Sequence, residues 1–291
     1  MTDHNPSPSP EVSNEADFEN LDIYKSYNKS PYLSIKHSSY FQVYTDLFEK
    51  YRGQPIVFVE VGILNGGSLF MWRDYFGPNA RIIGVDLNPA ARKWEKDGFE
   101  VHIGSQSDPN FWRGFFNSVG PVDIVLDDGG HTFDQQIITV HSCIPHLNDG
   151  GLMVVEDTHT SYFHDYGYPS KYSFIEWTKV LIDNINSRFS AVNASKLLYK
   201  EFVYSITAYE SIVSFKIDRK KCFVSSPTTN NGITSNAEDF RHKDPVVGAA
   251  MRDPRKQSFL DRVVGVKTIK KKGLRMSDDY RAKSRLGKYF Q

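Results

Sequence analysis

From residue 55 onward the sequence alternates short apolar runs with stretches of helical periodicity, and this alternation constrains the fold more than any other feature. The apolar runs are PIVFVEVG, ARIIGVDLN, FEVHIGS, PVDIVLDDGG and GLMVVEDTH. Buried runs of this length separated by helices are typical of βαβ units. The later stretch FVYSITAYESIVSFKID indicates two adjacent strands joined by a tight turn near Glu210. We therefore predict an α/β fold built on a mostly parallel sheet.

The composition changes along the chain and predicts its division into parts. The first part holds three prolines and almost nothing apolar, so we expect it to be disordered because it can bury so little surface. In the second part, large apolar side chains recur at helical spacing and predict an amphipathic helix: Phe41, Tyr44, Leu47 and Phe48. The expected boundaries are a leader over 1–20, a helical or lid segment over 21–54, the main domain over 55–220, and a polar, then basic, extension over 221–291.

The end of the chain is basic. Residues 264–291 hold nine Lys or Arg against two Asp. Such a tail can contact a phosphate-bearing partner or a membrane surface. A solvated or partly disordered terminus explains the same composition, and we favour that interpretation.

Charge and cysteine content exclude several classes of protein. Among 291 residues, Lys plus Arg and Asp plus Glu both number 35, so no overall charge favours nucleic acid as a partner. No apolar run approaches the roughly 20 residues needed to span a bilayer. The two cysteines lack CxxC spacing, which predicts a reduced, cytoplasmic protein.

The first predicted strand ends in a glycine-rich turn, EVGILNGGS, directly before a predicted helix. Glycines at such a turn let the backbone approach a ligand, because no Cβ intervenes. The spacing departs from the dinucleotide fingerprint GxGxxG, and Glu60, two residues before Gly62, would repel a pyrophosphate but suits an ammonium group. The turn therefore favours a ligand with an amino-acid moiety, such as S-adenosylmethionine, although a purely structural turn stays open.

The next two strand ends carry polar groups of matching chemistry. Asp86 follows the glycines by about 20 residues, where a carboxylate can accept hydrogen bonds from both ribose hydroxyls. The following strand leads into Gln106, Ser107 and Asp108, which can bond an adenine edge. Ser107-Asp108-Pro109 also resembles a helix start. The agreement among successive strand ends favours nucleoside binding.

Two later strand ends are acidic, and they read DDGGH and EDTHTSY. If these strands are neighbours, Asp128, Glu156 and Asp157 converge at one edge of the sheet. Carboxylates packed together need a compensating cation, and oxygen ligands favour Mg²⁺ or another hard divalent ion. Capping of the loops that follow is the alternative role for these acids.

His131 lies three residues after Asp128. Its unperturbed pKa near 6.5 suits it to take a proton from a hydroxyl held on the metal. His159 is a second candidate, for which we favour a role in orienting the loop or contacting the substrate. The aromatic and glycine-rich segment 162–168 is typical of a lid that stacks on a sugar, with Tyr162 and Tyr166 as expected substrate contacts.

Five motifs occur in order along the chain: EVGILNGGSLFMWRDYF, IIGVDLNP, SQSD, DIVLDDGGH and GGLMVVEDTHTSYF. Together they resemble the metal-dependent sugar O-methyltransferases of macrolide biosynthesis, namely the macrocin and mycinamicin enzymes. They are also similar to the rhamnosyl O-methyltransferase and cephalosporin hydroxylase-like groups. The resemblance covers roughly residues 30–217. It implies a Rossmann-like class I methyltransferase fold, with a seven-stranded sheet, helices on both faces and an antiparallel final strand. Gly130 departs from the serine common in that family, and the chain beyond residue 220 has no counterpart there.

The resemblance also implies roles for individual residues. It makes His131 the base, Asp128, Glu156 and Asp157 the metal ligands, and a sugar or glycosylated small molecule the acceptor. The resemblance also points to a homo-oligomer. The residues expected to hold S-adenosylmethionine are Glu60, Gly62, Gly66, Ser68, Asp86, Gln106, Ser107, Asp108 and Asp127.

Two alternative functions remain open at this stage. One is a nicotinamide-dependent oxidoreductase acting on a nucleotide sugar, against which the missing GxGxxG and the Glu60 carboxylate count. The other is a non-catalytic binding protein that keeps a methyltransferase-like domain. The intact set of acids and histidine argues against it.

Overall fold

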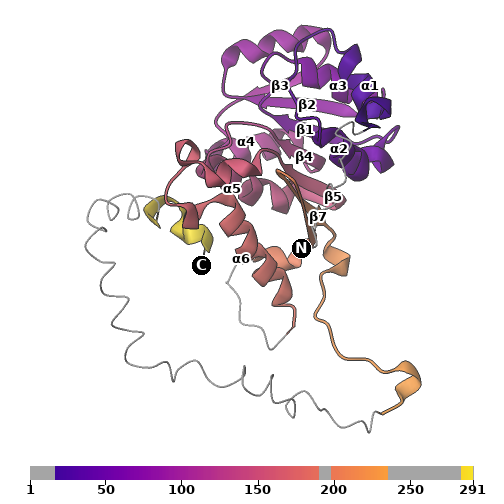
Figure 1. Cartoon of the computed structure of the whole chain (residues 1–291), viewed down its shortest axis with the longest axis vertical. Helices are drawn as coiled ribbons and strands as arrows, with labels where there is room; N and C mark the ends of the chain where they lie inside the picture. The colour runs from indigo at the N-terminus through magenta and orange to yellow at the C-terminus, as the bar shows by residue number, and fades with distance from the viewer. Residues whose placement is uncertain (1–16, 190–197, 235–282, 291) are drawn as a thin grey trace, which may run out of the picture.

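The computed structural model describes residues 17–189, 198–234 and 283–290 (Figure 1). At its centre is a seven-stranded sheet in the order β3-β2-β1-β4-β5-β7-β6. Strands β1 to β5 run parallel, and β7 pairs antiparallel with both β5 and β6. The predicted α/β fold, with its antiparallel final strand, is confirmed. The strands are β1 (Val57–Val61), β2 (Arg81–Asp86), β3 (Glu100–Ile103), β4 (Val122–Asp127), β5 (Leu147–Val155), β6 (Val203–Tyr209) and β7 (Ile212–Ile217).

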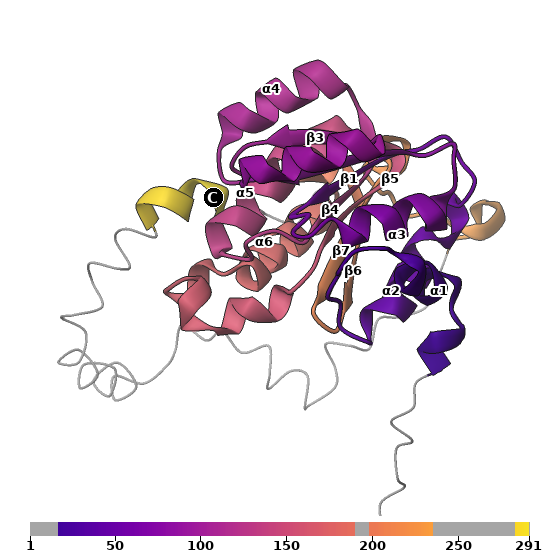
Figure 2. The same cartoon turned by 90° about the horizontal axis from the view of Figure 1, so that it is seen from above.

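Helices cover both faces of this sheet (Figures 1 and 2). Successive strand residues point to opposite faces, so Phe58 and Ile124 join one core, whereas Val59 and Val125 join the other. No helix in the described part of the chain is long and apolar enough to cross a membrane. The first core packs against α1 (Asp22–Lys29), α2 (Tyr40–Phe48) and α3 (Gly67–Phe76), and the second against α4 (Pro109–Val119), α5 (Phe133–Cys143) and α6 (Phe174–Asn186).

The order of strands reverses between β1 and β4. From β1 the chain proceeds outward to β2 and β3, and then returns to place β4 on the other side of β1. The loops that follow two such strands diverge, which leaves a crevice at their carboxyl ends where open α/β sheets bind ligands. The loops after β1, β4 and β5 carry the predicted glycine turn and both acidic motifs, so the topology brings them to one edge.

The N-terminal part is more ordered than the sequence predicts. The predicted helix is confirmed as α2, whose Phe41, Tyr44 and Phe48 are buried. The predicted leader, however, extends too far, because Asp17–Asn20 form a 3-10 turn and the ring of Phe18 stacks on Phe41 at 5.8 Å. Residues 1–16 of that leader lie outside the described residues.

Between α1 and α2, residues 30–39 run without regular secondary structure across the glycine turn. The hydroxyl of Ser30 donates to the carbonyl of Gly67 at 2.8 Å, and the hydroxyl of Tyr27 donates to the carbonyl of Ser34 at 2.8 Å. A Cβ at Gly67 would overlap the backbone of Leu33. The backbone of this segment therefore lies directly against the start of α3.

The last residues of the chain return to the domain. The favoured expectation of a solvated terminus is wrong for residues 283–290, because Leu286 and Tyr289 are 1% and 3% exposed. The indole nitrogen of Trp177 in α6 donates to the carbonyl of Tyr289 at 2.9 Å, and Arg285 pairs with Asp134 in α5. The rest of the predicted basic tail, 264–282, lies outside the described residues.

Replacing Tyr289 with alanine should lower the free energy of unfolding by roughly 3 kcal/mol, because it removes a buried ring and leaves a cavity. Urea denaturation followed by circular dichroism measures the change. Tyr204→Ala is the matched control, since Tyr204 is 41% exposed on β6 and its loss should cost far less. If Tyr289→Ala lowered the free energy of unfolding as little as Tyr204→Ala, the C-terminal segment would not stabilise the domain.

Candidate functional site

A cleft of about 510 Å³ lies at the carboxyl ends of β1, β2 and β4. This volume is within the range of small-molecule sites. Three of the nine predicted donor-binding residues line the cleft, Gly62, Asp86 and Gln106, and it also reaches the predicted base and two of the acids. Its lining includes Ile35, Gly62, Leu64, Asp86, Leu87, Gly104, Ser105, Gln106, Asp128, Gly129, Gly130, His131, Gln135 and Asp157.

Gly62 forms the floor of the cleft and has to be glycine. Its φ is +83°, and a Cβ at this position would overlap the carbonyl oxygen of Asp128. The loops after β1 and β4 thus touch at Gly62, and its amide donates to the carbonyl of Val85 at 2.8 Å. Gly66 differs, because the space beside it is filled by the ring of Trp94 and it does not line the cleft.

Gly62→Ala should destabilise the protein by about 3 kcal/mol, because it combines an unfavourable positive φ with a backbone overlap. Gly98→Ala is the control, since Gly98 also has a positive φ, +81°, but its nearest neighbour is the Arg73 guanidinium at 4.0 Å. The control should lose only about 1 kcal/mol. Thermal denaturation separates the two, and similar melting temperatures would mean that the loop after β4 can move aside.

Asp86 is held in the cleft by backbone amides. Its carboxylate accepts from the amide of Ile63 at 3.1 Å and from that of Asn88 at 2.8 Å. These bonds fix both oxygens at the end of β2, and the remaining lone pairs can still accept ribose hydroxyls. Asp86 therefore lies where the sequence predicts a nucleoside to bind.

Gln106 supports the cleft from behind. Its amide nitrogen donates to Asp127 at 2.9 Å and to Thr139 at 3.1 Å, and its carbonyl oxygen accepts from the amide of Gly130 at 2.9 Å. Because these bonds use both ends of the side chain, Gln106 positions the DDGGH loop rather than offering free groups to an adenine edge.

Other predicted donor-binding residues do not line the cleft. Asp108 is the N-cap of α4 and accepts from the amide of Asn110 at 2.9 Å, and Ser107 lies beside Ser105 at 3.0 Å. Asp127 is buried, and burial raises its pKa to about 7. These residues shape the loops that surround the cleft.

Glu60 is also directed away from the cleft. It is fully buried and accepts from Ser68 at 2.7 Å and from the indole of Trp72 at 3.1 Å. Burial raises its pKa to about 7, although the ammonium of Lys36, 3.8 Å away, opposes that rise. Glu60 and Ser68 therefore join β1 to α3, and neither of them lines the cleft.

The acidic motifs divide into accessible and buried groups. Asp128, His131 and Asp157 offer ligand atoms within 4.8 Å of one another. The side chains of Asp128 and Asp157 are 18% and 20% exposed, so both can reach a ligand and water. Glu156 is only 1% exposed and is linked to Asp128 through the ammonium of Lys36. The structure thus brings together two of the three predicted metal ligands with the predicted base.

A lysine that the sequence analysis did not single out as a site residue occupies the space beside Glu156. The ammonium of Lys36 lies 2.6 Å from Asp128 and 3.0 Å from Glu156, and its side chain is 2% exposed. Burial tends to lower the pKa of Lys36, but the surrounding carboxylates outweigh it and hold that pKa well above its usual value. Its partners are 92 and 120 residues away in sequence, so no local pattern signals this contact.

Three residues around the accessible acids have left-handed backbone conformations. The φ angles are +59° for His131, +54° for Asp157 and +62° for Ser211. Such conformations are uncommon outside glycine and gather at functional sites. Here they turn the side chains of His131 and Asp157 toward each other, with Nε2 of His131 at 3.3 Å from Oδ2 of Asp157.

Asp157 is held by a chain of polar contacts from three elements. The hydroxyl of Tyr40 donates to its Oδ1 and lies 2.8 Å from the hydroxyl of Ser211, which in turn lies 2.5 Å from Nδ1 of His159. His159 is thus linked through Ser211 to the contacts of Asp157, and its side chain is 40% exposed. Its role in orienting the loop or contacting the substrate stays a prediction. Tyr40 and Ser211 are further residues that the sequence analysis missed, because neither follows one of the motifs.

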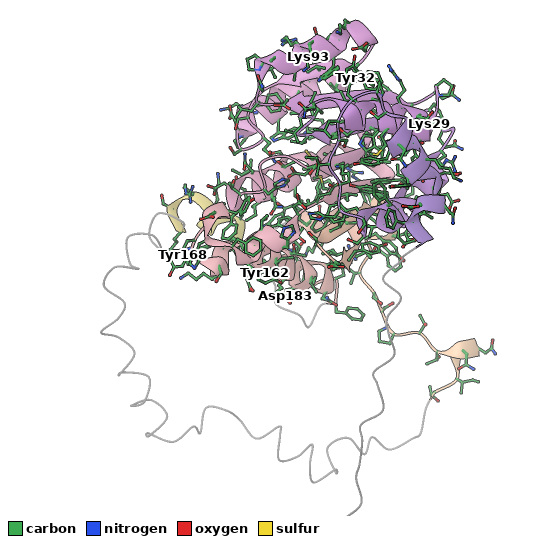
Figure 3. All side chains as sticks on the ribbon, turned by 45° about the horizontal axis from the view of Figure 1, so that its top comes forward. Lys29, Tyr32, Lys93, Tyr162, Tyr168 and Asp183 are labelled. Carbon is green, nitrogen blue, oxygen red and sulfur yellow. The ribbon has the colours of Figure 1, made fainter. Side chains whose placement is uncertain are left out.

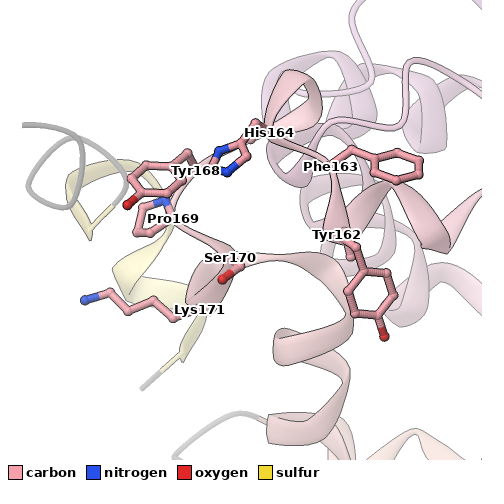
Figure 4. Close-up of a pocket in the computed structure, with 9 residues that line it drawn as sticks. Tyr162, Phe163, His164, Tyr168, Pro169, Ser170 and Lys171 are labelled. Carbon is pink, nitrogen blue, oxygen red and sulfur yellow. The ribbon is translucent and has the colours of Figure 1, made fainter. Parts of the chain in front are cut away.

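A second cavity, of about 420 Å³, lies in the predicted aromatic segment (Figure 4). Tyr162 and Phe163 stand on one side, and the stacked rings of His164 and Tyr168 on the other. Tyr162 and Tyr168 lie on a part of the surface away from Tyr32 (Figure 3). Tyr166 lines a neighbouring hollow that it shares with Arg285 and Leu286. Predicted substrate contacts thus border this surface, and Tyr162 is 73% exposed.

Part of the chain is similar to known methyltransferases. Residues 59–158 match the family described as a methyltransferase domain. The chain is 35% identical over 145 residues to the 8-demethyl-8-alpha-L-rhamnosyl tetracenomycin-C 2'-O-methyltransferase of Streptomyces olivaceus, covering 45% of this chain and 38% of that protein. It is 33% identical over 127 residues to the demethylmacrocin O-methyltransferase of Streptomyces fradiae, covering 41% of this chain and 32% of that protein. The chain thus spans less than two fifths of the length of these relatives.

A solved structure supports the same relationship. The MycE methyltransferase of the mycinamycin biosynthetic pathway, in complex with Mg and SAH, superposes with a TM-score of 0.60 and 26% sequence identity, covering 71% of this chain and 55% of that one. Residues 59–158 thus match a methyltransferase domain, and part of the chain is similar to the tetracenomycin-C and demethylmacrocin O-methyltransferases and to MycE.

Proposed function

We propose that this protein transfers a methyl group from S-adenosylmethionine to a hydroxyl of a sugar or a glycosylated small molecule. One observation carries the proposal: the cleft at the carboxyl ends of β1, β2 and β4 holds Asp86 at one end and Asp128, His131 and Asp157 at the other. A donor bound along it would present its methyl group next to a base and a cluster of acids.

The lining of the cleft fits the donor. Gly62 lines the cleft where β1 ends, and Asp86 offers fixed carboxylate oxygens to a ribose. MycE, which shares the fold, was solved with SAH. In our proposal Gly62, Leu64, Asp86, Gly104 and Ser105 hold the donor, whereas Glu60, Ser68, Gln106, Asp108 and Asp127 act by shaping the surroundings of the cleft.

The accessible acids fit a hard divalent ion, because Asp128 and Asp157 present oxygen ligands within reach of each other and of solvent. Asp128 and Asp157 would hold the ion. When bound, an ion such as Mg²⁺ lowers the pKa of a coordinated hydroxyl and orients its oxygen. MycE was solved with Mg.

His131 acts as the general base in this proposal. Asp157, 3.3 Å from its Nε2, orients the ring and stabilises the imidazolium that forms. The acceptor hydroxyl gives its proton to His131 while its oxygen forms a bond to the donor methyl carbon. The carbon–sulfur bond breaks at the same time, and its electron pair stays on sulfur to give S-adenosylhomocysteine.

The acceptor is proposed to be a sugar. The aromatic cavity in the loop after β5 offers rings that can stack on a sugar face, and Tyr162 and Phe163 are exposed there. The tetracenomycin relative is named for a rhamnosyl acceptor, and a MycE complex contains mycinamycin VI. The expected homo-oligomer also stays a prediction.

Isothermal titration calorimetry with S-adenosylhomocysteine and with NAD tests the donor. Incubation with S-adenosylmethionine, Mg²⁺ and a panel of rhamnosides and macrolide glycosides, followed by mass spectrometry, tests the transfer. We expect S-adenosylhomocysteine to bind, NAD not to bind, and one acceptor to gain a methyl group. Binding of NAD alone would favour an oxidoreductase, and binding of neither would favour a non-catalytic protein.

A further inference from the structure

Lys36 lies where a divalent ion shared by Asp128 and Glu156 would have to lie. Its ammonium is 2.6 Å from Oδ2 of Asp128, and it is 3.0 Å and 3.3 Å from the two oxygens of Glu156. A metal ion binds carboxylate oxygens at about 2.0–2.6 Å, so an ion between these two acids and the ammonium exclude each other.

Both carboxylate oxygens of Glu156 already accept hydrogen bonds. Oε1 accepts from the hydroxyl of Tyr44 at 2.5 Å as well as from Lys36, and Oε2 accepts from Lys36. The whole group is closed off, because Glu156 and Tyr44 are both fully buried. A divalent ion that takes substrate and water as further ligands needs an open site, which this corner does not offer.

The opposite side of Asp128 is open. Lys36 bonds only Oδ2 of this carboxylate, and Asp157 and His131 lie within reach and partly exposed. Magnesium is commonly held by one or two carboxylates while it keeps several waters, so Asp128 and Asp157 are sufficient.

We propose that Lys36 is an internal counter-ion that keeps Glu156 out of the metal's coordination sphere, so that the ion binds Asp128 and Asp157 at the mouth of the cleft. Lys36 is a positioning residue for the metal. Glu156 serves to hold Lys36, and through it the segment 30–39, rather than to bind the ion. This inference rests on the proposed metal-assisted function and sharpens its ligand set.

Titration of the full-length protein with Mn²⁺, followed by electron paramagnetic resonance without donor or acceptor, tests the assignment. Because Glu156 is not a ligand, Glu156→Gln should leave the Kd for Mn²⁺ within about threefold of the wild type, whereas Asp157→Asn should weaken it by at least about tenfold. Gln keeps the size of the side chain and an acceptor for Tyr44. The double variant K36M/E156Q preserves net charge and should bind Mn²⁺ more tightly than wild type, because the competing ammonium is gone.

Lys29→Met is the control for removing a lysine, since Lys29 pairs with Asp74 on the surface and should leave the Kd unchanged. Weakening by Glu156→Gln as large as that by Asp157→Asn would overturn this inference and leave the proposed methyl transfer standing. So would a K36M/E156Q variant that binds no more tightly than wild type. A wild-type protein that binds no Mn²⁺ at millimolar concentration would overturn the inference and the metal part of the proposed function together.

Discussion

Replacing His131 with alanine lowers the turnover number for methyl transfer by about 10²- to 10⁴-fold, the range expected when a positioned general base is removed. Among the histidines of the described residues, His131 lies nearest to the Asp157 carboxylate, with its Nε2 3.3 Å from Oδ2. Steady-state kinetics with a methylated acceptor as product measures the loss. The Kd for S-adenosylhomocysteine should stay close to that of the wild type, because the donor contacts lie toward Asp86.

His159→Ala serves as the matched control. His159 also lies beside Asp157, but at 3.9 Å, and its nearest polar partner is Ser211. Its removal should lower turnover far less than that of His131. If His131→Ala kept full turnover at neutral pH, or if His159→Ala lowered turnover more, His131 would not be the base.

Replacing Asp128 with asparagine reduces activity by roughly 10³-fold, because polarisation of a substrate oxygen by a metal ion contributes several kcal/mol to stabilising the transition state. Asp128 lines the cleft, pairs with Lys36 and lies close to His131 and Asp157. Activity measured against Mg²⁺ concentration, together with inhibition by a chelator and its reversal by Mg²⁺, reports the effect. Circular dichroism should show a folded variant.

Asp165→Asn provides the comparison for Asp128→Asn. Asp165 is an exposed acid in the loop after β5, and no contact places it at the cleft, so its replacement should leave the dependence on Mg²⁺ as in the wild type. Full activity of Asp128→Asn in the presence of chelator would show that the reaction proceeds without an ion at this position.

The parts of the site that could be predicted are those that depend on neighbours in sequence. A glycine turn after a buried strand, and acids after two further strands, follow from the alternation of apolar runs, because parallel strands bring their carboxyl ends to one edge. The fold, the cleft and the closeness of Asp128, His131 and Asp157 were accessible in this way.

The direction of each side chain at a strand end was harder to predict. Glu156 follows β5 directly and faces Tyr44, whereas Asp157 has a left-handed backbone that turns its side chain toward His131. Asp127 and Asp128 also differ, since Asp127 bonds Gln106 and Asp128 bonds Lys36. The members of each acidic pair are neighbours in sequence, but the structure directs them to different surroundings.

Contacts across long stretches of sequence could not be predicted. Lys36 bonds acids 92 and 120 residues away, and Tyr40 meets Asp157 at a separation of 117. Nothing in the local sequence distinguishes this lysine or this tyrosine from others in the same polar, aromatic segment. The return of Tyr289 to α6, at a separation of 112 residues, escaped prediction for the same reason.

The hydrogen bond between Tyr44 and Glu156 links the local unfolding of helix α2 to that of the sheet. Helix α2 is short, and a short peripheral helix ordinarily frays independently of the sheet. Lifting α2 away, however, would take the Tyr44 hydroxyl from a fully buried carboxylate and disturb the neighbouring ammonium of Lys36. Buried charges left without partners are strongly unfavourable. The amide protons of α2 should therefore exchange with solvent deuterium as slowly as those of β4 and β5. Helix α2 and the centre of the sheet would then unfold as one cooperative unit.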